Sequence, residues 1–330
     1  MSTLSVVVVA HQSAGDLART LPAVTAQMRD GDELIVVDCG SSDRPERAVP
    51  ESAQLVRVEN LGFAGGAVVG AERARGDLVL FLNPDAEPLP GCLDALREAP
   101  AAWGAWQALV LMDDGETVNT AGNVAHWLGI GWAGGCGQPA GAFEPRTVGF
   151  ASGAALVVRR ELWQQVGGFD PRYFMYGEDQ DLSLRLRLAG HEVGLLPAAR
   201  VRHAYSFDKG DYKWFHLERN RAWTVLSVYP APLLALLAPA LLAFELALLA
   251  VAARGGWLGA KTRAQRAVLR DLPAILRRRR TVQAQRAVPA ARFAQALSAD
   301  LDSPFLGPVA ELPLLAAAQR AYWRAVLRCI

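Results

Sequence analysis

Cysteine is scarce and unpatterned in this chain. Four cysteines stand at positions 39, 92, 136 and 329 of 330 residues, with no CxxC spacing among them. No signal peptide precedes the first predicted strand, so we expect a reduced, cytoplasmic setting. Internal repeats and disordered tracts are lacking too. The 52% hydrophobic content is enough to bury one large core with an appendage.

Net charge is almost absent, at +1, but it is unevenly distributed. Residues 254–292 hold eleven arginines and lysines and a single acid, Asp271, which leaves about −9 on residues 1–253. The acidic main part of the chain would repel a phosphate backbone, and no nucleic-acid-binding module accompanies the arginines. We therefore exclude nucleic acid as a partner.

Three apolar, largely β-branched runs predict buried parallel strands joined by crossover connections. They are Leu4–Ala10, Glu33–Val37 and Leu78–Leu82, and each ends in polar or acidic residues. In open α/β sheets ligands gather beyond the carboxyl ends of parallel strands. The polar strand ends are therefore candidate ligand groups, although such residues also cap the helices that follow strands.

Three acids, Glu178, Asp179 and Asp181, gather within four residues behind an aromatic-rich turn. Like charges packed this closely tend to be solvated, metal-bound or engaged in proton transfer, and one of them can serve as a general base. The alternative is a solvated helix start. Leucine at every second position over 182–188 fits a strand, but the i, i+4 spacing and Gly190 favour a helix.

Six sequence blocks carry a resemblance to a known family: VVVVAHQS, VVDCGSSD, ENLGFAGG, FLNPDAEP, SGAALVVRRELWQQVGGFD and FMYGEDQDLSLRLRLAG. In this order they resemble the family 2 glycosyltransferases, with the bacterial rhamnosyltransferase-like branch most similar. The resemblance covers roughly residues 4–221. It implies an α/β GT-A fold with a Rossmann-like, mostly parallel sheet, a nucleotide-sugar donor, divalent Mg²⁺ or Mn²⁺, and inversion at the anomeric carbon. We expect a catalytic domain over 1–221 and a C-terminal helical, membrane-associating extension over 222–330.

The resemblance also assigns catalytic and metal-binding roles. Asp179 is the expected base on the acceptor hydroxyl, with Glu178 and Asp181 raising its pKa or orienting the acceptor. No Lys-bearing P-loop is present, so a carboxylate-held metal is the expected neutraliser of the diphosphate. Asp85 matches the last acid of the DxD motif, and His203 is the expected second ligand or a structural histidine. Glu87 is a weaker candidate, expected to leave the site on a turn.

Donor contacts are expected from the strand ends and the glycine-rich segment. Asp38 stands where the family places an acid facing the base, which favours a UDP- or dTDP-linked sugar. His11, Cys39, Ala67 and Val68 depart from the usual family residues. Arg219 and Arg221 are expected to meet the diphosphate or the acceptor. The full donor-binding set is Ala10, His11, Asp38, Asn60, Gly62, Phe63, Gly65, Asn83, Asp85, Ser152 and Gly153.

Several aromatic side chains lie in the middle region. Packing in the core is the main expectation for them, and a sugar-stacking platform is the alternative. They are Trp103, Trp106, Trp127, Trp132 and Phe150.

Residues 231–253 are almost wholly apolar, long enough to span a bilayer. One crossing would separate a cytosolic donor site from the Arg-rich tail, which the positive-inside rule also places in the cytosol. We therefore expect an interfacial or shallow re-entrant helix, with Arg277–Arg280 contacting anionic lipid or a lipid-linked pyrophosphate. The alternative is a buried helix of a small helical domain, or an oligomer interface, with the arginines solvated.

These observations predict an inverting, metal-dependent glycosyltransferase at the inner face of the cell membrane. Its acceptor is expected to be a cell-surface polysaccharide or polyprenyl-linked glycan, and dTDP-rhamnose is a candidate donor. A catalytically silent sugar-nucleotide or glycan-binding subunit is an alternative, which the intact ED block disfavours. A nucleotidyltransferase is disfavoured because AHQSAGD lacks a basic, Gly-rich phosphate loop.

Overall fold

The computed structural model describes residues 2–141, 143–204, 212–301 and 313–330. The chain divides into two compact units. The first contains Met1–Asn123, Ala133–Leu186 and His191–Ser206, and the second contains Val124–Trp132, Arg187–Gly190 and Phe207–Ile330. The predicted boundary after residue 221 falls inside helix α6 (Tyr212–Val228), which belongs to the second unit.

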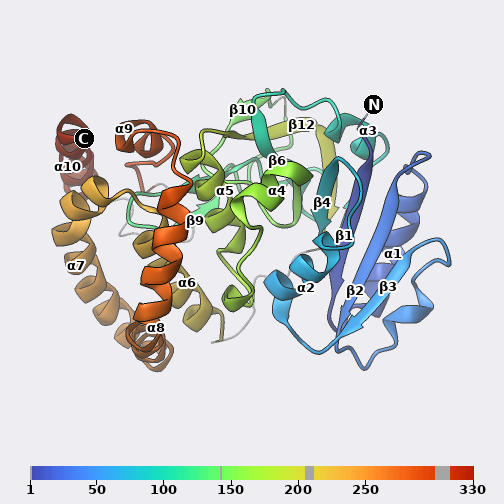
Figure 1. The fold of residues 1–330 in the computed structure, drawn as a ribbon, viewed down its shortest axis with the longest axis horizontal. Helices are drawn as coiled ribbons and strands as arrows, with labels where there is room; N and C mark the ends of the chain where they lie inside the picture. Colours follow the sequence, from blue (N-terminus) through green and yellow to red (C-terminus); the bar gives the residue numbers. More distant parts are fainter. Residues whose placement is uncertain (1, 142, 205–211, 302–312) are drawn as a thin grey trace. The chain divides into compact units, whose positions relative to one another are not determined.

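The first unit is built on one large mixed sheet (Figure 1). Along the sheet the strand order is β10-β12-β6-β11-β4-β1-β2-β3, with β5 paired to β12 and β7 to β6. The pairs β1–β2, β1–β4, β2–β3 and β6–β12 are parallel, whereas β11 is antiparallel to both neighbours. The strands are β1 (Leu4–Ala10), β2 (Glu33–Cys39), β3 (Gln54–Val58), β4 (Leu78–Leu82), β5 (Ala86–Pro88), β6 (Trp103–Leu111), β7 (Val118–Thr120), β10 (Arg146–Thr147), β11 (Ala155–Arg159) and β12 (Glu192–His203).

The three predicted strands are confirmed, and their buried, β-branched composition explains why they occupy the centre of the sheet. Ala10 lies opposite Asp38 in the parallel register of β1 and β2, so the polar residues after both strands reach the same edge. The antiparallel strand β11 starts where β4 ends, with Ala155 opposite Leu82. The loop before β11 therefore arrives at the same edge as the residues after β4.

Helices complete the first unit. They are α1 (Ala14–Thr25), α2 (Gly62–Ala71), α3 (Cys92–Leu96), α4 (Arg160–Val166) and α5 (Glu178–Leu188), whose last two residues belong to the second unit. Short 3-10 turns lie at Pro45–Arg47 and Pro171–Tyr173. The prediction of a helix at 182–188 is confirmed. The four leucines at 182, 184, 186 and 188 are all buried, so this helix is enclosed on several sides. Their alternation therefore resembles a strand pattern although the segment is helical.

The five middle-region aromatics are all buried, as the packing interpretation predicted. Two short strands, β8 (Asn123–Ala125) and β9 (Gly131–Ala133), pair outside the main sheet. Trp127, which follows β8, stacks on Trp323 within the second unit, with ring centroids 6.1 Å apart.

The second unit is mostly helical, which confirms the predicted C-terminal helical extension. Its main helices are α6, α7 (Ala231–Arg254), α8 (Leu258–Ala284), α9 (Ala290–Ala294) and α10 (Pro313–Cys329). Helix α7 is long and apolar enough to cross a membrane, but only Leu233, Leu237 and Ala252 are buried along it. The alternative of a helix buried within the described domain is therefore wrong.

Candidate active site

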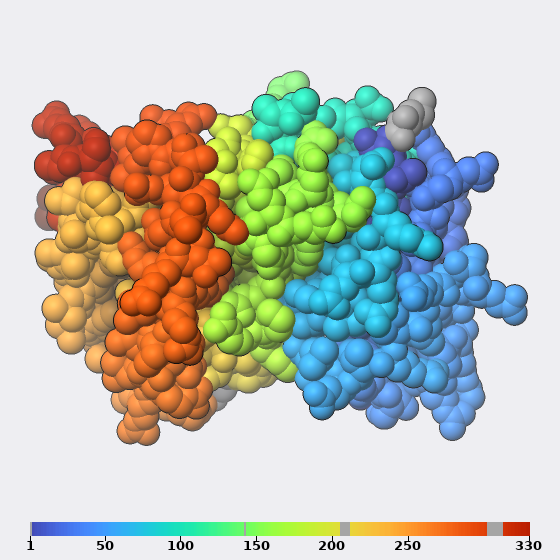
Figure 2. Space-filling model, in the orientation of Figure 1, coloured from blue at the N-terminus to red at the C-terminus, as the bar shows by residue number. Residues whose placement is uncertain are grey.

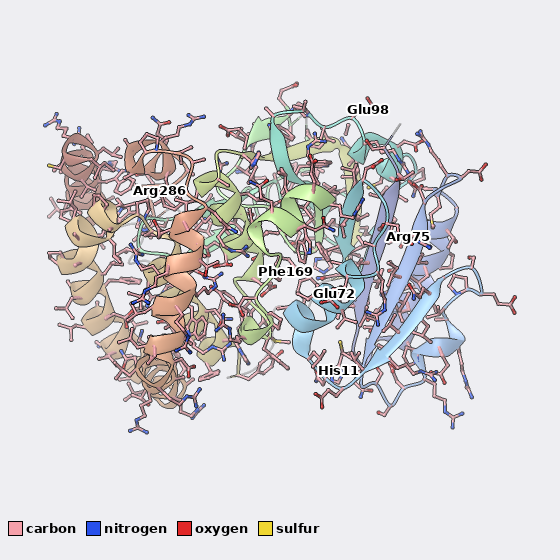
Figure 3. All side chains as sticks on the ribbon, in the orientation of Figure 1. His11, Glu72, Arg75, Glu98, Phe169 and Arg286 are labelled. Carbon is pink, nitrogen blue, oxygen red and sulfur yellow. The ribbon has the colours of Figure 1, made fainter. Side chains whose placement is uncertain are left out.

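Polar groups meet after the carboxyl ends of β1 and β2, near His11, which Figure 3 labels. The His11 Nδ1–H donates to the Cys39 carbonyl at 2.8 Å, and Asn60 Nδ2 lies 3.4 Å from His11 Nε2. Because a neutral imidazole has one donor and one acceptor nitrogen, His11 Nε2 accepts from the Asn60 amide. Asp38 is 5% exposed, and its Oδ1 accepts from the Ser41 N–H at 2.9 Å. The structure thus brings together the predicted donor residues His11, Asp38 and Asn60.

The glycine-rich segment forms helix α2, so the prediction of a donor-side loop is wrong. Gly62 has a φ of +69°, and a Cβ there would lie 2.4 Å from the Phe174 carbonyl oxygen. A Cβ on Gly66 would lie 2.6 Å from a Val9 methyl group. These glycines allow α2 to pack closely against the turn before α5 and against β1. A backbone contact from Gly62 or Gly65 to the donor remains a prediction.

Asp85 and His203 meet although 118 residues separate them. His203 Nε2 lies 3.0 Å from Asp85 Oδ1, and Asn83 Nδ2 lies 3.4 Å from the same nitrogen. Strand β12 ends at His203 beside β5, which follows Asp85 directly, so the sheet sets this distance. The Asp85 side chain is 20% exposed, whereas that of His203 is 3% exposed.

A divalent cation fits this pair. Carboxylate oxygen suits Mg²⁺ and Mn²⁺, and imidazole is a common additional ligand of transition metals. Among the described residues, no group of three or more His, Cys, Asp or Glu side chains could hold a metal ion. The remaining positions would therefore go to diphosphate oxygens and water, as is usual where Mg²⁺ binds with a nucleotide.

Glu87 is not on a turn, so that prediction is wrong. It lies in β5 opposite Arg202 of β12, and its carboxylate pairs with the Arg202 guanidinium at 2.5 Å. The turn before β5 contains Pro84 and Asp85 instead.

Asp179 is held at the start of α5 by backbone donors. The Gly153 N–H donates to its Oδ2 at 3.0 Å, and the Gln180 N–H donates to its Oδ1 at 2.7 Å. Gly153 belongs to the loop before β11, and Ala154 in that loop accepts from the Asn83 N–H at 3.0 Å. Asp179 and the Asn83–Asp85 turn are therefore joined through a single loop.

The neighbouring acid, Glu178, is 6% exposed, and its Oε2 has no hydrogen-bond partner within the described ranges. Burial, followed by the charge of Asp179, raises the pKa of Glu178 well above its ordinary value. Burial also raises the pKa of Asp179, although the N–H groups of Gly153 and Gln180 oppose the rise. The pair is thus poised to hold a proton at higher pH than ordinary carboxyl groups do.

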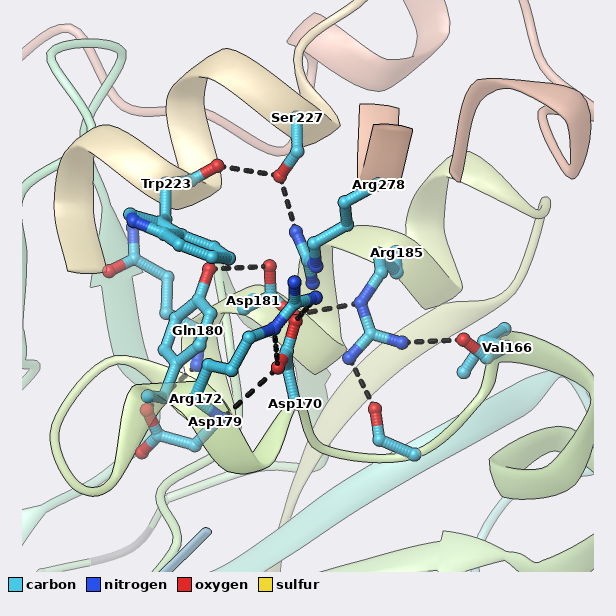
Figure 4. A network of polar contacts seen from close by, with 12 residues as sticks. Val166, Asp170, Arg172, Asp179, Gln180, Asp181, Arg185, Trp223, Ser227 and Arg278 are labelled. Carbon is cyan, nitrogen blue, oxygen red and sulfur yellow. Dashed lines mark hydrogen bonds and ion pairs between the residues drawn. The ribbon is translucent and has the colours of Figure 1, made fainter. Parts of the chain in front are cut away.

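Asp181 is fully buried and lies within a network of polar contacts (Figure 4). Its carboxylate accepts from the Tyr173 hydroxyl at 2.9 Å and from Arg185 Nε at 2.8 Å. Arg185 in turn donates to the backbone carbonyls of Val166 and Gly168. The prediction that Asp181 orients the acceptor is wrong, because all its carboxylate contacts in this network are internal. It is a positioning residue that ties α5 to the GGFD turn.

Two residues that the sequence did not single out support this loop cluster. Gln107, fully buried on β6, accepts from the Ser152 N–H at 2.8 Å. Phe169 of the GGFD turn (Figure 3) packs on Phe81 of β4, with ring centroids 5.2 Å apart. Gln107 is the one polar residue of the run Trp103–Leu111, and nothing in the sequence marks it as a partner of the Ser152 loop.

Arg221 and Arg219 lie on α6 in the second unit. The Arg221 guanidinium is buried and ion-paired to Glu218 at 3.0 Å and to Glu245. A diphosphate or acceptor contact by Arg221 is therefore contradicted. Arg219 donates from Nε to Asn220 Oδ1 at 2.9 Å, and its substrate contact remains a prediction.

Sequence comparisons decide the family. Glycosyl transferase family 2 matches residues 5–166, and glycosyltransferase like family 2 matches residues 139–225. The N-acetylglucosaminyl-diphospho-decaprenol L-rhamnosyltransferase of Mycobacterium tuberculosis is 31% identical over 258 residues, covering 68% of this chain and 83% of that protein. The chain belongs to glycosyltransferase family 2. The rhamnosyltransferase WbbL of Escherichia coli is 37% identical over 70 residues, or 21% of this chain and 26% of that one.

Solved structures show that this family 2 glycosyltransferase has the GT-A fold. GalNAc-T7 with UDP, GalNAc and Mn²⁺ has a TM-score of 0.58 at 17% identity, covering 70% of this chain and 49% of that chain. The mannosyltransferase PcManGT from Pyrobaculum calidifontis, with GDP-Man and Mn²⁺, has a TM-score of 0.50 at 19% identity, covering 98% and 86%. Membership of the family confirms the enzyme prediction and its rhamnosyltransferase-like branch.

Proposed function

We propose that this glycosyltransferase moves a sugar, with inversion, from a nucleoside diphosphate to a lipid-linked or cell-surface glycan. One observation carries the proposal: the loop before β11 joins Asp179 to the turn that bears Asp85. A partly exposed carboxylate with a raised pKa thus stands beside a carboxylate–imidazole pair suited to a metal-bound diphosphate.

The donor is proposed to be a dTDP- or UDP-sugar, with Asp38 and His11 beside the base. Dinucleotide and nucleotide ligands of open α/β sheets occupy this carboxyl edge, where His11, Asp38 and Asn60 converge. Rhamnose is the proposed sugar because the relatives from M. tuberculosis and E. coli are named rhamnosyltransferases.

Asp85 and His203 would hold the divalent cation. When bound, such a cation neutralises the charge that develops on the departing diphosphate. Mn²⁺ accompanies UDP in the GalNAc-T7 structure and GDP-Man in the PcManGT structure.

Asp179 is the proposed base. It takes the proton of the acceptor hydroxyl as that oxygen bonds to the anomeric carbon, while the bond from that carbon to the diphosphate oxygen breaks on the opposite side. The Gly153 and Gln180 N–H groups fix its orientation, and burial makes it a stronger base than an ordinary aspartate. Glu178 is the supporting acid beside it, and its own raised pKa lets the pair retain a proton.

The acceptor is proposed to be linked to a polyprenyl diphosphate, as the name of the M. tuberculosis relative states for that protein. Such an acceptor is anchored in a membrane, and nucleotide sugars are cytoplasmic. We therefore place the enzyme at the inner face of the cell membrane.

Calorimetric titration with UDP, dTDP and GDP, each with Mn²⁺ and with EDTA, tests donor binding. Metal-dependent binding of UDP or dTDP, lost in Asp85→Ala, is the expected result. Transfer from dTDP-rhamnose to a polyprenyl-diphosphate-linked N-acetylglucosamine then tests the acceptor. Failure of every nucleotide to bind would overturn the proposal and favour the silent-subunit alternative.

A further inference from the structure

Helix α7 presents a continuous apolar face to its surroundings. Leu242 and Leu246 are 64% and 61% exposed, and Val251 is 49% exposed. The exposed positions recur at helical spacing, so they share one side of the helix. Among them are Ala235, Ala238, Pro239, Leu242, Ala243, Leu246, Ala247, Ala250 and Val251.

The one charged residue within this apolar stretch, Glu245, is turned away from that face. Its carboxylate pairs with Arg221 of α6 and, at 2.6 Å, with Lys261 of α8, and Gln265 Nε2 donates to it at 3.2 Å. Lys261 is 1% exposed and also pairs with Glu218. Two acids and two bases thus form a neutral, largely buried ion cluster. Because breaking such a cluster is costly, it fixes the rotation of α7 with the acid inward and the leucines outward.

Helix α8 continues the apolar surface. Leu269, Leu272 and Leu276 are exposed, at 71%, 37% and 48%. They follow Gln265 at spacings of four, seven and eleven residues, so they lie on the stripe of α8 that contacts α7 through Glu245. The leucine row of α8 therefore borders α7.

Three exposed arginines flank these leucines on α8, whose surface is orange in Figure 2; they are Arg263, Arg266 and Arg277. Part of the run Arg277–Arg280, which the sequence predicted to contact lipid, does not belong to this exposed row. Arg279 donates to the carbonyls of Leu226 and Tyr229, and Arg278 donates to the Ser227 hydroxyl (Figure 4). Within Arg277–Arg280, the two central arginines thus fix α8 to the end of α6.

We propose that the outward face of α7 and the leucine row of α8 form a docking surface for an anionic lipid bilayer, with α7 lying along the interface. Apolar residues enter the acyl boundary while Arg263, Arg266 and Arg277 meet lipid phosphate, as in interfacial amphipathic helices. A second copy of the chain fits less well, because a two-fold contact through this face would bring the arginine rows together. The proposal deepens the proposed function, which requires access to a membrane-anchored acceptor.

Flotation with vesicles tests the surface. Full-length protein is mixed with phosphatidylcholine vesicles containing or lacking phosphatidylglycerol, at low and high salt. The variant L242S/L246S removes two exposed leucines, and Leu314→Ser, at an 87% exposed position of α10, is the matched control. A second variant, R263Q/R266Q/R277Q, removes the charge row.

The wild type and L314S are expected to float with anionic vesicles. L242S/L246S should lose about tenfold or more in partitioning, because two apolar side chains that would enter the acyl boundary are replaced by polar ones. The arginine variant should lose the salt dependence. Circular dichroism and unchanged binding of nucleotide would show that the variants are folded. Absence of wild-type flotation, or equal flotation of L242S/L246S, would overturn the proposal. The proposal would also be overturned if light scattering showed that the wild type is a dimer, that L242S/L246S is a monomer, and that neither protein binds vesicles.

This assay is independent of the transfer reaction. If wild-type protein floats but transfers no sugar, the proposed function fails and the docking surface stands. If it transfers to a short-chain, water-soluble acceptor without floating, the docking surface alone fails.

Discussion

Asp181 and Arg185 form a buried ion pair one turn apart on α5, with Arg185 Nε 2.8 Å from Asp181 Oδ2. The two terminal guanidinium nitrogens of Arg185 donate to the carbonyls of Val166 and Gly168. The start of α5, which carries Asp179, is thereby tied to the GGFD turn. The position of the proposed base therefore depends on a pair that touches no substrate.

Asp181→Asn is expected to destabilise the protein by about 3 kcal/mol, because it leaves the buried Arg185 charge poorly compensated. Denaturant unfolding measures the loss, and kcat should fall together with it. Asp16→Asn is the control: its partner, Arg19, lies on the surface, and the cost should stay below about 1 kcal/mol. Equal stabilities of the two variants would contradict the positioning role.

Asp179→Asn is expected to abolish transfer while leaving metal-dependent nucleotide binding nearly intact. The amide keeps the shape and can still accept from the Gly153 N–H, but it cannot take a proton. Product analysis and calorimetry on the same sample separate the two effects. Transfer within a few-fold of the wild type would remove Asp179 from the role of base.

Glu178→Gln is expected to raise stability at neutral pH. The raised pKa means that the folded state keeps the Glu178 proton after the unfolded state has lost it, so stability contributed by this group falls as pH rises above the ordinary value of 4.5. The amide side chain of the variant does not titrate, so it causes no such loss of stability as pH rises. The difference in melting temperature, variant minus wild type, should grow from pH 4.5 upward, and a constant difference across pH would refute the shift.

The central strands and the acid cluster could be predicted because their signals are local. β1, β2 and β4 are mainly apolar runs, and the ED block begins a helix whose i, i+4 leucines and terminal glycine can be recognised in the sequence. The pairing of Asp85 with His203 was predicted through the family resemblance. Its physical cause, the β5–β12 register, joins distant segments and has no local signature.

The wrong predictions involve partners that arrive from elsewhere in the chain. Asp181 looked like a third acid of the active site because its internal partners were not apparent. Tyr173 donates to Asp181, and the Val166 carbonyl holds Arg185, only after the chain has folded back in a turn. The glycines of α2 suggested a ligand-binding loop, but their missing side chains make room for Phe174 and Val9. Arg221 looked available because one of its two acidic partners, Glu245, lies 24 residues along the chain.

Gly62→Ala is expected to disrupt the junction between α2 and the turn before α5. A Cβ at this positive-φ position would lie 2.4 Å from the Phe174 carbonyl oxygen, and the Ala64 N–H that bonds this oxygen at 3.0 Å would have to move. We expect a loss of about 2 kcal/mol and weaker nucleotide binding. Gly15→Ala in α1 meets nothing within 4 Å and should be neutral or stabilising. Equal effects of the two substitutions would contradict the close packing.

Glu245 provides an acid-sensitive element in the second unit. Burial alone would raise its pKa, but Arg221 and Lys261 lower it to about 2. A carboxyl group whose folded pKa is lowered stabilises the protein above its ordinary value of 4.5, and that stability is lost as pH falls toward 2. Glu245→Gln should therefore cost about 3 kcal/mol at neutral pH and much less near pH 2, because it removes one partner of a buried cluster. Denaturant unfolding at several pH values, followed by tryptophan fluorescence, measures both limits. A pH-independent loss would show that the contribution of Glu245 is packing rather than charge, and the ion cluster would then not be what sets the rotation of α7.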